Sequence, residues 1–268
     1  MLPAMDLPAH DHPPDSAAQR AADWRRFRRA AGASALFVAV LAIVYAAQAG
    51  FSARAFAVAP GSAAGLFGLL TAPLLHGSLE HLVANGVAVL FLGTLAGWVY
   101  PRATLRGLPL MWLGSGLGAW LLGAPGSYHL GASGVTHGLM FLVMALAVLR
   151  RDRAAIAASM IGFMFYGGML LTVLPREPGV SWQSHLGGAI GGIVAAWLFR
   201  RLDPAAPRKR YSWELEEEQA AADAERIAAE RGQFEPGAPE DVPVLWNRPE
   251  PSGEEHGTIL QFPPRDRR

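Results

Sequence analysis

The chain has 268 residues, of which 51% are hydrophobic and only 17% charged, and its formal net charge is +1. Its mean hydropathy is +0.22, and soluble domains usually carry about 25% charged residues, so the composition favours a membrane protein. Cysteine is absent, which excludes a disulfide framework, a thiolate metal site and a cysteine nucleophile.

Residues 1–29 are predicted to form a disordered cytosolic leader that ends in a cluster of arginines, before a first apolar run at 30–50. A basic segment followed by an apolar run also resembles a secretory signal, here with a cleavage-like site at residues 46–49. A retained first helix is the simpler interpretation, because further apolar runs follow it.

Five more apolar runs have the length of membrane spans, since a hydrocarbon core of about 30 Å needs roughly 17–25 residues per helix. They cover residues 74–98, 106–123, 131–149, 154–174 and 183–199. The predicted fold is therefore all-α and integral to the membrane, with six transmembrane helices within residues 30–200. Residues 201–268 are predicted to be a cytosolic tail, with one polar helix near 213–231 and a disordered Pro-rich segment.

The distribution of Lys and Arg predicts the orientation, because short cytoplasmic loops are enriched in these residues. With six spans, fifteen Lys and Arg residues flank the membrane on the side of the termini and two lie on the other side. Both termini are therefore expected in the cytosol. The strong preference for Arg over Lys, with abundant Ala and Gly, suggests a bacterial source and hence the cytoplasmic (inner) membrane.

Polar side chains inside apolar spans are functional candidates because burying them in lipid is costly. His81 and Asn85 lie four residues apart on one face of the second span, Ser133 begins the fourth and His185 begins the sixth. These three spans run in the same direction across the membrane. Their first turns therefore lie at one depth, near the outer leaflet, where these four residues can meet.

Glycines four residues apart on two of these spans predict close helix packing, as small-xxx-small faces do in membranes. Gly134 and Gly138 follow Ser133, and Gly188 and Gly192 follow His185. Packing of these faces would bring the Ser133 hydroxyl and the His185 imidazole within hydrogen-bond reach.

A serine hydroxyl beside a neutral imidazole is a nucleophile with its general base. No Asp lies within the spans, so a Ser–His dyad is expected in place of a triad. The side chains of His81 and Asn85 and the backbone N–H of Ser133 could stabilise an oxyanion. These residues alone leave a transporter open, whereas the His76–His81 spacing disfavours a zinc protease, which needs histidines four apart.

Three blocks together resemble the rhomboid family of intramembrane serine proteases. They are His76-Gly-Ser-Leu-Glu-His81-Leu-Val-Ala-Asn85, Gly131-Ala-Ser133-Gly134 and His185-Leu-Gly-Gly188-Ala-Ile-Gly-Gly192, in the order of the family. The resemblance covers roughly residues 33–200 and implies that Ser133 is the nucleophile and His185 the base. It implies an oxyanion hole made by His81, Asn85 and the Ser133 amide.

The resemblance also implies the partners: single-span membrane proteins, cut near the outer boundary of the membrane, and membrane lipid. Neither a metal, nor another cofactor, nor nucleic acid is expected. The sequence departs from the family at Phe67-Gly68, where the first loop often carries Trp-Arg, and at His137, where the family has an aromatic residue stacked on the catalytic histidine. A non-enzymatic rhomboid-like binding protein is the second hypothesis, and the presence of both Ser133 and His185 argues against it.

Overall fold

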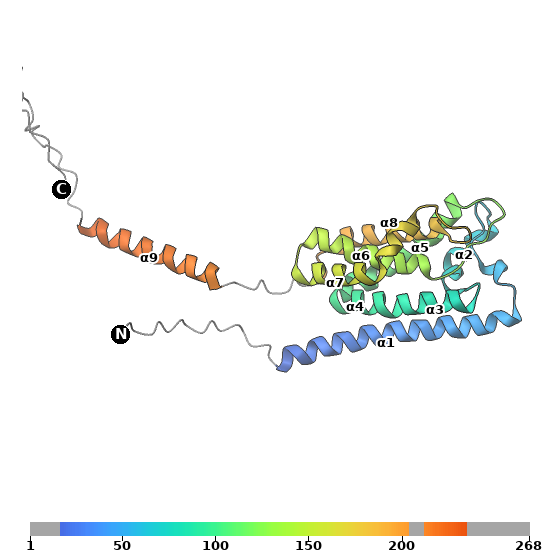
Figure 1. Ribbon diagram of the computed structural model, residues 1–268, viewed down its shortest axis with the longest axis horizontal. Helices are drawn as coiled ribbons and strands as arrows, with labels where there is room; N and C mark the ends of the chain where they lie inside the picture. Colours follow the sequence, from blue (N-terminus) through green and yellow to red (C-terminus); the bar gives the residue numbers. More distant parts are fainter. Residues whose placement is uncertain (1–16, 204–211, 235–268) are drawn as a thin grey trace, which may run out of the picture. The chain divides into compact units, whose positions relative to one another are not determined.

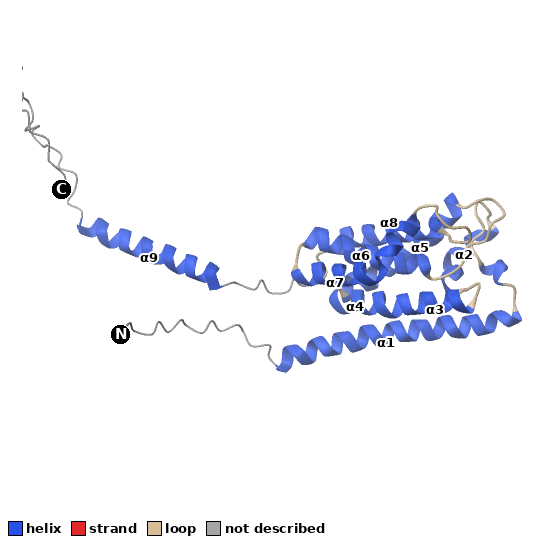
Figure 2. Cartoon of the chain, viewed as in Figure 1, coloured by secondary structure: helices blue, strands red, loops and turns tan. Residues whose placement is uncertain are grey.

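The computed structural model describes residues 17–203 and 212–234, and every regular element in these ranges is helical (Figure 2). Contacts divide the chain into two units, residues 1–208 and 209–268. The first unit contains α1 (Ala17–Ala47), α2 (Gly68–Thr71), α3 (Leu79–Ala88), α4 (Thr94–Val99), α5 (Pro101–Leu122), α6 (Ser133–Arg150), α7 (Arg153–Tyr166) and α8 (Trp182–Phe199). The second contains α9 (Ser212–Phe234).

Helix α1 begins at Ala17, well inside the segment predicted to be a disordered leader. Residues 17–29 continue without a break into the first apolar run, because Ala and Arg both favour the helix and no Pro or Gly interrupts them. That part of the leader prediction is wrong, and residues 1–16 lie outside the described residues. In the tail, α9 covers the predicted polar helix, whereas the Pro-rich segment also lies outside the described residues.

Within the described ranges, four helical segments are long and apolar enough to cross a membrane. They are Arg20–Gly50, Leu79–Val99, Ser133–Arg150 and Arg153–Val173. The predicted third and sixth spans correspond to α5 and α8, of 22 and 18 residues, which are not among these four segments. Each helix carries polar residues near its start: Arg102 and Arg106 in α5, and Gln183, Ser184 and His185 in α8.

The Leu79–Val99 segment joins α3 to α4 through a π-helical turn, Val89–Gly93. A second irregular segment, the 3₁₀ turns of Gly167–Val173, continues α7. Helix α8 packs against both α5 and α6, α6 packs against α7, and α1 lies beside α3 and α4 (Figure 1). The main apolar core lies among α4, α5, α6, α7 and α8 and includes Leu92, Met111, Met140, Leu142 and Leu146.

Glycines on α8 bring its backbone against two neighbouring helices. A Cβ at Gly188 or Gly192 would strike the carbonyl groups of Gly134 and Gly138 on α6, the pairing expected from the sequence. On the other side, a Cβ at Gly187 would strike the carbonyl of Gly114 on α5. No large side chain separates α8 from either helix at these points, so its position is closely defined.

The first loop is fixed to α5 and to the turn before α6. Val58 exchanges two backbone hydrogen bonds with His129, each 2.9 Å long. The indole N–H groups of Trp112 and Trp120 donate to the carbonyls of Leu70 and Ser62 at 3.2 and 3.0 Å. These contacts anchor the loop although it lacks the Trp-Arg pair of the family.

Candidate active site

Ser133 and His185 come together at the starts of α6 and α8. The Nε2 atom of His185 lies 2.9 Å from Oγ of Ser133. The His185 side chain is in the first turn of α8, whose N-cap Ser181 accepts a hydrogen bond from the Ser184 amide. His185 is only 6% exposed. The two glycine faces beneath this pair bring the two helix starts close enough for the contact.

A carbonyl on the far side of the ring determines the tautomer of His185. Nδ1 of His185 lies 3.0 Å from the backbone oxygen of Thr172, which can only accept a hydrogen bond. Nδ1 therefore carries the proton in the neutral ring, and Nε2 presents its lone pair to the Ser133 hydroxyl. The backbone of Thr172 thus supplies the orientation that an Asp side chain supplies in a triad.

His137 lies one helical turn after Ser133 and stacks on His185. The two ring centroids are 3.8 Å apart and the ring planes are inclined by 13°. Nδ1 of His137 lies 2.6 Å from the Ser133 carbonyl oxygen, and Nε2 lies 2.8 Å from the Thr172 hydroxyl oxygen. His137 therefore connects the carbonyl of Ser133 to the segment that orients His185.

His81 and Asn85 on α3 point toward the turn that precedes Ser133. A Cβ built on Gly131 would lie 2.8 Å from Nε2 of His81 and 3.5 Å from Nδ2 of Asn85. Gly131 has a φ of +119°, a conformation that only glycine adopts readily. It therefore permits both the turn and the close approach of the two side chains.

Asn85 is buried, and its Nδ2 atom has no hydrogen-bond partner among the described residues. A buried unsatisfied donor costs about 1–3 kcal/mol, and such groups concentrate where a ligand will satisfy them. The Ser133 amide is in the first turn of α6, where N–H groups lack intrahelical partners. Two side-chain donors, those of His81 and Asn85, thus lie beside Gly131, and the Ser133 amide lies two residues further along the chain.

His76 and Gln48 take part in this region although their roles were not predicted. Gln48 donates to the His76 carbonyl at 2.8 Å and accepts from the His76 amide at 3.0 Å. The His76 ring is fully buried and packs edge-on against His81, with ring centroids 5.1 Å apart. In the described part of the chain, no three His, Asp or Glu side chains converge as they would around a metal ion.

The role of Thr172 was not predicted from the sequence, because its contact with His185 is made by a backbone carbonyl, which every residue type has. Its hydroxyl also joins His137, but a Thr inside an apolar run is common and gives no such signal. Gln48 was missed because it follows the first apolar run, in a segment with no recognisable pattern. Its pairing with His76 depends on how the end of α1 meets the start of α3.

The sequence model of the family described as "Rhomboid domain" matches residues 63–202. Similar proteins include an uncharacterized protein of Mycobacterium tuberculosis, 39% identical over 148 residues, which are 50% of this chain and 59% of that protein. Another is an uncharacterized protein of Mycobacterium leprae, 38% identical over 141 residues, which are 50% of this chain and 56% of that protein. The chain thus spans somewhat more than half the length of these relatives.

Proposed function

Because the chain belongs to the rhomboid family, a family of intramembrane serine proteases, we propose that it hydrolyses peptide bonds of membrane proteins with a Ser133–His185 dyad. The observation that carries this proposal is the 2.9 Å contact between His185 Nε2 and Ser133 Oγ. The carbonyl of Thr172 on Nδ1 of the same ring directs the free lone pair toward the hydroxyl. Neither a metal nor another cofactor is needed for this chemistry.

In the first step, the Ser133 oxygen attacks the scissile carbonyl carbon while His185 Nε2 accepts the hydroxyl proton. The carbonyl oxygen becomes an oxyanion, stabilised by the side chains of His81 and Asn85 and by the Ser133 amide. Asn85 Nδ2 has no hydrogen-bond partner among the described residues. This supports its role, because an oxyanion bound there would accept a hydrogen bond from it. The positive end of the α6 dipole adds to the stabilisation.

The imidazolium of His185 then protonates the leaving amine, and the C–N bond breaks to give an acyl-enzyme. Water attacks this ester in the second half of the reaction, with His185 again accepting a proton. The carboxylic acid product leaves, and the Ser133 hydroxyl is restored. Stacking of His137 on His185 holds the ring in one plane through both halves.

The proposal includes six membrane spans, with α5 and α8 as the third and sixth. In this arrangement the starts of α3, α6 and α8 lie at the outer side, and the arginine-rich flanks lie in the cytosol with both termini and the tail. The dyad is then close to the outer membrane boundary. The substrates are accordingly single-span membrane proteins cut near that boundary, and the location is a bacterial inner membrane.

The test is cleavage of a model single-span substrate by the purified full chain in detergent, compared with Ser133→Ala and His185→Ala. We expect cleavage by the unaltered protein and a loss of at least about 10³-fold in either variant. Asn85→Ala is expected to slow cleavage by about 10²–10³, the usual effect of removing one oxyanion donor.

Each variant is to be checked for an unchanged thermal unfolding temperature, so that loss of activity is not loss of fold. Cleavage that persists in Ser133→Ala would refute the nucleophile assignment. Absence of cleavage by the unaltered protein over a panel of such substrates would favour a rhomboid-like binding protein.

A further inference from the structure

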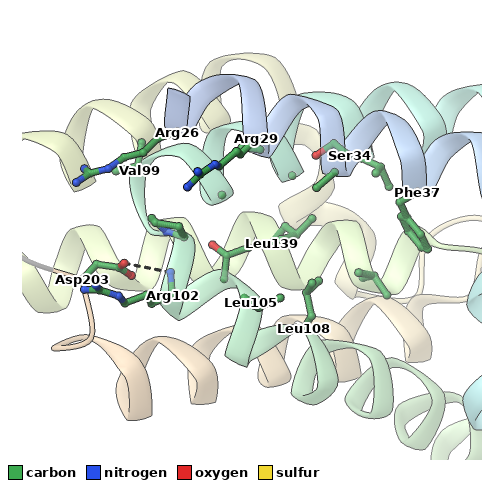
Figure 3. A pocket seen from close by; sticks show the side chains of 18 residues that line it. Arg26, Arg29, Ser34, Phe37, Val99, Arg102, Leu105, Leu108, Leu139 and Asp203 are labelled. Carbon is green, nitrogen blue, oxygen red and sulfur yellow. Dashed lines mark hydrogen bonds between the residues drawn. The ribbon is translucent and has the colours of Figure 1, made fainter. Parts of the chain in front are cut away.

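A cavity of about 560 Å³ lies between α1 and the helices α4 and α5, at the end of the bundle where α1 and α5 begin (Figure 3). Ser133, His185, His81 and Asn85 do not line it. One end of the cavity is charged, with Arg26, Arg29, Arg102 and Asp203, and the rest is almost entirely apolar. The cavity therefore has the amphipathic character of a lipid and is separate from the proposed protease site.

The charged end carries a positive excess. Arg26 and Arg29 lie three residues apart on one face of α1, and both are exposed. Arg26 has an ion pair with Asp23 at 3.9 Å, whereas Arg29 has no ion pair or hydrogen bond to another described residue. Arg102 donates through Nη1 to the Leu202 carbonyl at 3.1 Å, which leaves its other N–H groups available.

Among the described residues, Asp203 is the only acidic one that lines the cavity, and its charge is already compensated. Its two carboxylate oxygens accept hydrogen bonds from the amides of Arg102 and Ala103 at 3.1 and 2.9 Å. These amides are at the N-terminus of α5, where the helix dipole favours a negative charge. The carboxylate therefore caps α5, and the three arginines are left to attract an anion.

The apolar part of the cavity runs along the helices away from the arginines. Phe37 on α1, Leu108 on α5 and Leu139 on α6 line it. Arg26 and Phe37 are eleven residues apart, which is about 16 Å along a helix and roughly half of a hydrocarbon core of about 30 Å. The length of the cavity thus matches one leaflet.

Two further features of the lining favour a phospholipid over a free anion or a simple hydrocarbon. Thr104 is only 7% exposed. It lines the cavity, and its hydroxyl has no hydrogen-bond partner among the described residues. A glycerol ester between headgroup and acyl chain would supply a polar partner at an intermediate depth. Leu105, which also lines the cavity, is 71% exposed. In the orientation proposed above it faces the hydrocarbon, so that the cavity wall adjoins the bilayer.

We infer that this cavity binds one anionic phospholipid, with its phosphate against Arg26, Arg29 and Arg102 and an acyl chain along Phe37, Leu108 and Leu139. In the orientation proposed above, this lipid belongs to the cytoplasmic leaflet. It fills the space between α1 and the α4–α5 corner and so ties α1 to the rest of the bundle. A free phosphate would leave the apolar part of the cavity empty.

The experiment is native mass spectrometry of the purified full chain, titrated with phosphatidylglycerol or with phosphatidylcholine of the same acyl chains. We expect one phosphatidylglycerol to bind preferentially. In Arg26→Gln/Arg29→Gln its apparent affinity is expected to fall by about 30-fold, at roughly fivefold per arginine. The matched control is Arg25→Gln/Arg28→Gln, which removes the same charge from the same turns of α1 but from residues that do not line the cavity.

An equal loss of affinity in both double variants would overturn the site, because it would indicate general attraction to a basic helix. Equal binding of the two lipids would also overturn it. Displacement of phosphatidylglycerol by millimolar inorganic phosphate would indicate a free-anion site. The unaltered protein gives an independent result, since phosphatidylglycerol should raise its unfolding temperature more than phosphatidylcholine does.

Ala33→Trp tests the apolar part without changing any charge. Ala33 lines the cavity and is exposed, so an indole there occupies cavity space and not the core. Binding of phosphatidylglycerol should weaken at least tenfold. Undiminished binding to a variant with an unchanged unfolding temperature would contradict the proposed path of the acyl chain.

Discussion

Helix α8 and the segment that continues α7 both reach the candidate active site, but α8 and α7 are held in opposite ways. Backbone-to-backbone contacts with α5 and α6 fix α8 through glycines on two of its faces. Helix α7 buries only Ala155, Ala158 and Gly162 and exposes most of its large apolar side chains to the surroundings. Yet the segment that continues α7 carries Thr172, whose carbonyl and hydroxyl contact His185 and His137. The proposed base thus lies on a helix held by close backbone contacts, whereas the carbonyl that contacts its ring lies in the segment that follows a less buried helix.

Substitutions at the glycine contacts of α8 should have the largest effect on folding. Gly188→Val places a Cβ atom against the Gly134 carbonyl, and overpacking of this kind costs about 3 kcal/mol. We expect a large fall in the thermal unfolding temperature in detergent and loss of cleavage. Ile190→Val, at an exposed position of the same helix, is the control and should change little. An unchanged unfolding temperature in Gly188→Val would mean that the two helices are not in direct contact.

The start of α7 is held by polar contacts at Asp152, outside the membrane-spanning helices. Its carboxylate accepts from the Tyr100 hydroxyl at 2.8 Å, from Arg150 Nε at 2.7 Å and from the Ala155 amide at 2.7 Å. Burial by itself raises the pKa of this carboxyl, but these hydrogen bonds and the Arg150 charge outweigh burial and hold the pKa below 3.8. A lowered pKa means that the charged form stabilises the fold at all pH values above the unfolded pKa.

Asp152→Asn is therefore expected to destabilise the protein by about 2 kcal/mol at neutral pH. The difference from the unaltered protein should shrink as the pH falls below about 3.8 toward the lower pKa of the folded state. Unfolding temperatures measured near pH 7 and near pH 3 would check this. A difference that stays constant across that range would show that the charge of Asp152 is not what matters.

The looser segment should affect rate more than stability. Thr172→Val keeps the carbonyl that orients His185 but removes the hydroxyl beside His137 Nε2. We expect about a tenfold fall in cleavage rate, corresponding to one hydrogen bond, with little change in unfolding temperature. Thr172→Ser retains the hydroxyl and should restore the rate. If Thr172→Ser does not restore the cleavage rate although the two variants have the same unfolding temperature, the hydroxyl has no part in positioning His137.

The smallest effect is expected on the exposed face of α7. Met164 is 70% exposed, so Met164→Ala should change the free energy of unfolding by less than about 0.5 kcal/mol. The same change at Met140, which is fully buried in α6, should cost about 2–5 kcal/mol. Equal effects at the two methionines would remove the contrast between the two helices.

Much of this arrangement follows from residue types that leave a trace in the sequence. Apolar runs located the helices to within a few residues, apart from α1, whose basic first turns continue the helix. Ser133, His185, His81 and Asn85 stand out because polar groups are rare in apolar spans. The contribution of Thr172 could not be predicted, because it depends on a carbonyl and on the irregular end of α7. The close packing of α8 against α5 was also not predicted, because nothing in the sequence distinguishes Gly114 and Gly187 from the many other glycines.

The π-helical turn at Val89–Gly93 sets the helical phase between two parts of one span. Before it, His81 and Asn85 lie beside Gly131, in the candidate active site; after it, Leu95 and Ala96 face the core among α4 to α8. Each residue of a helix advances the rotation by about 100°, so deleting one residue of this turn would rotate the two proposed oxyanion donors away from Gly131 while leaving α4 packed. The turn thus lets the catalytic face and the packing face of one span be aligned independently, and its length in residues matters more than its side chains.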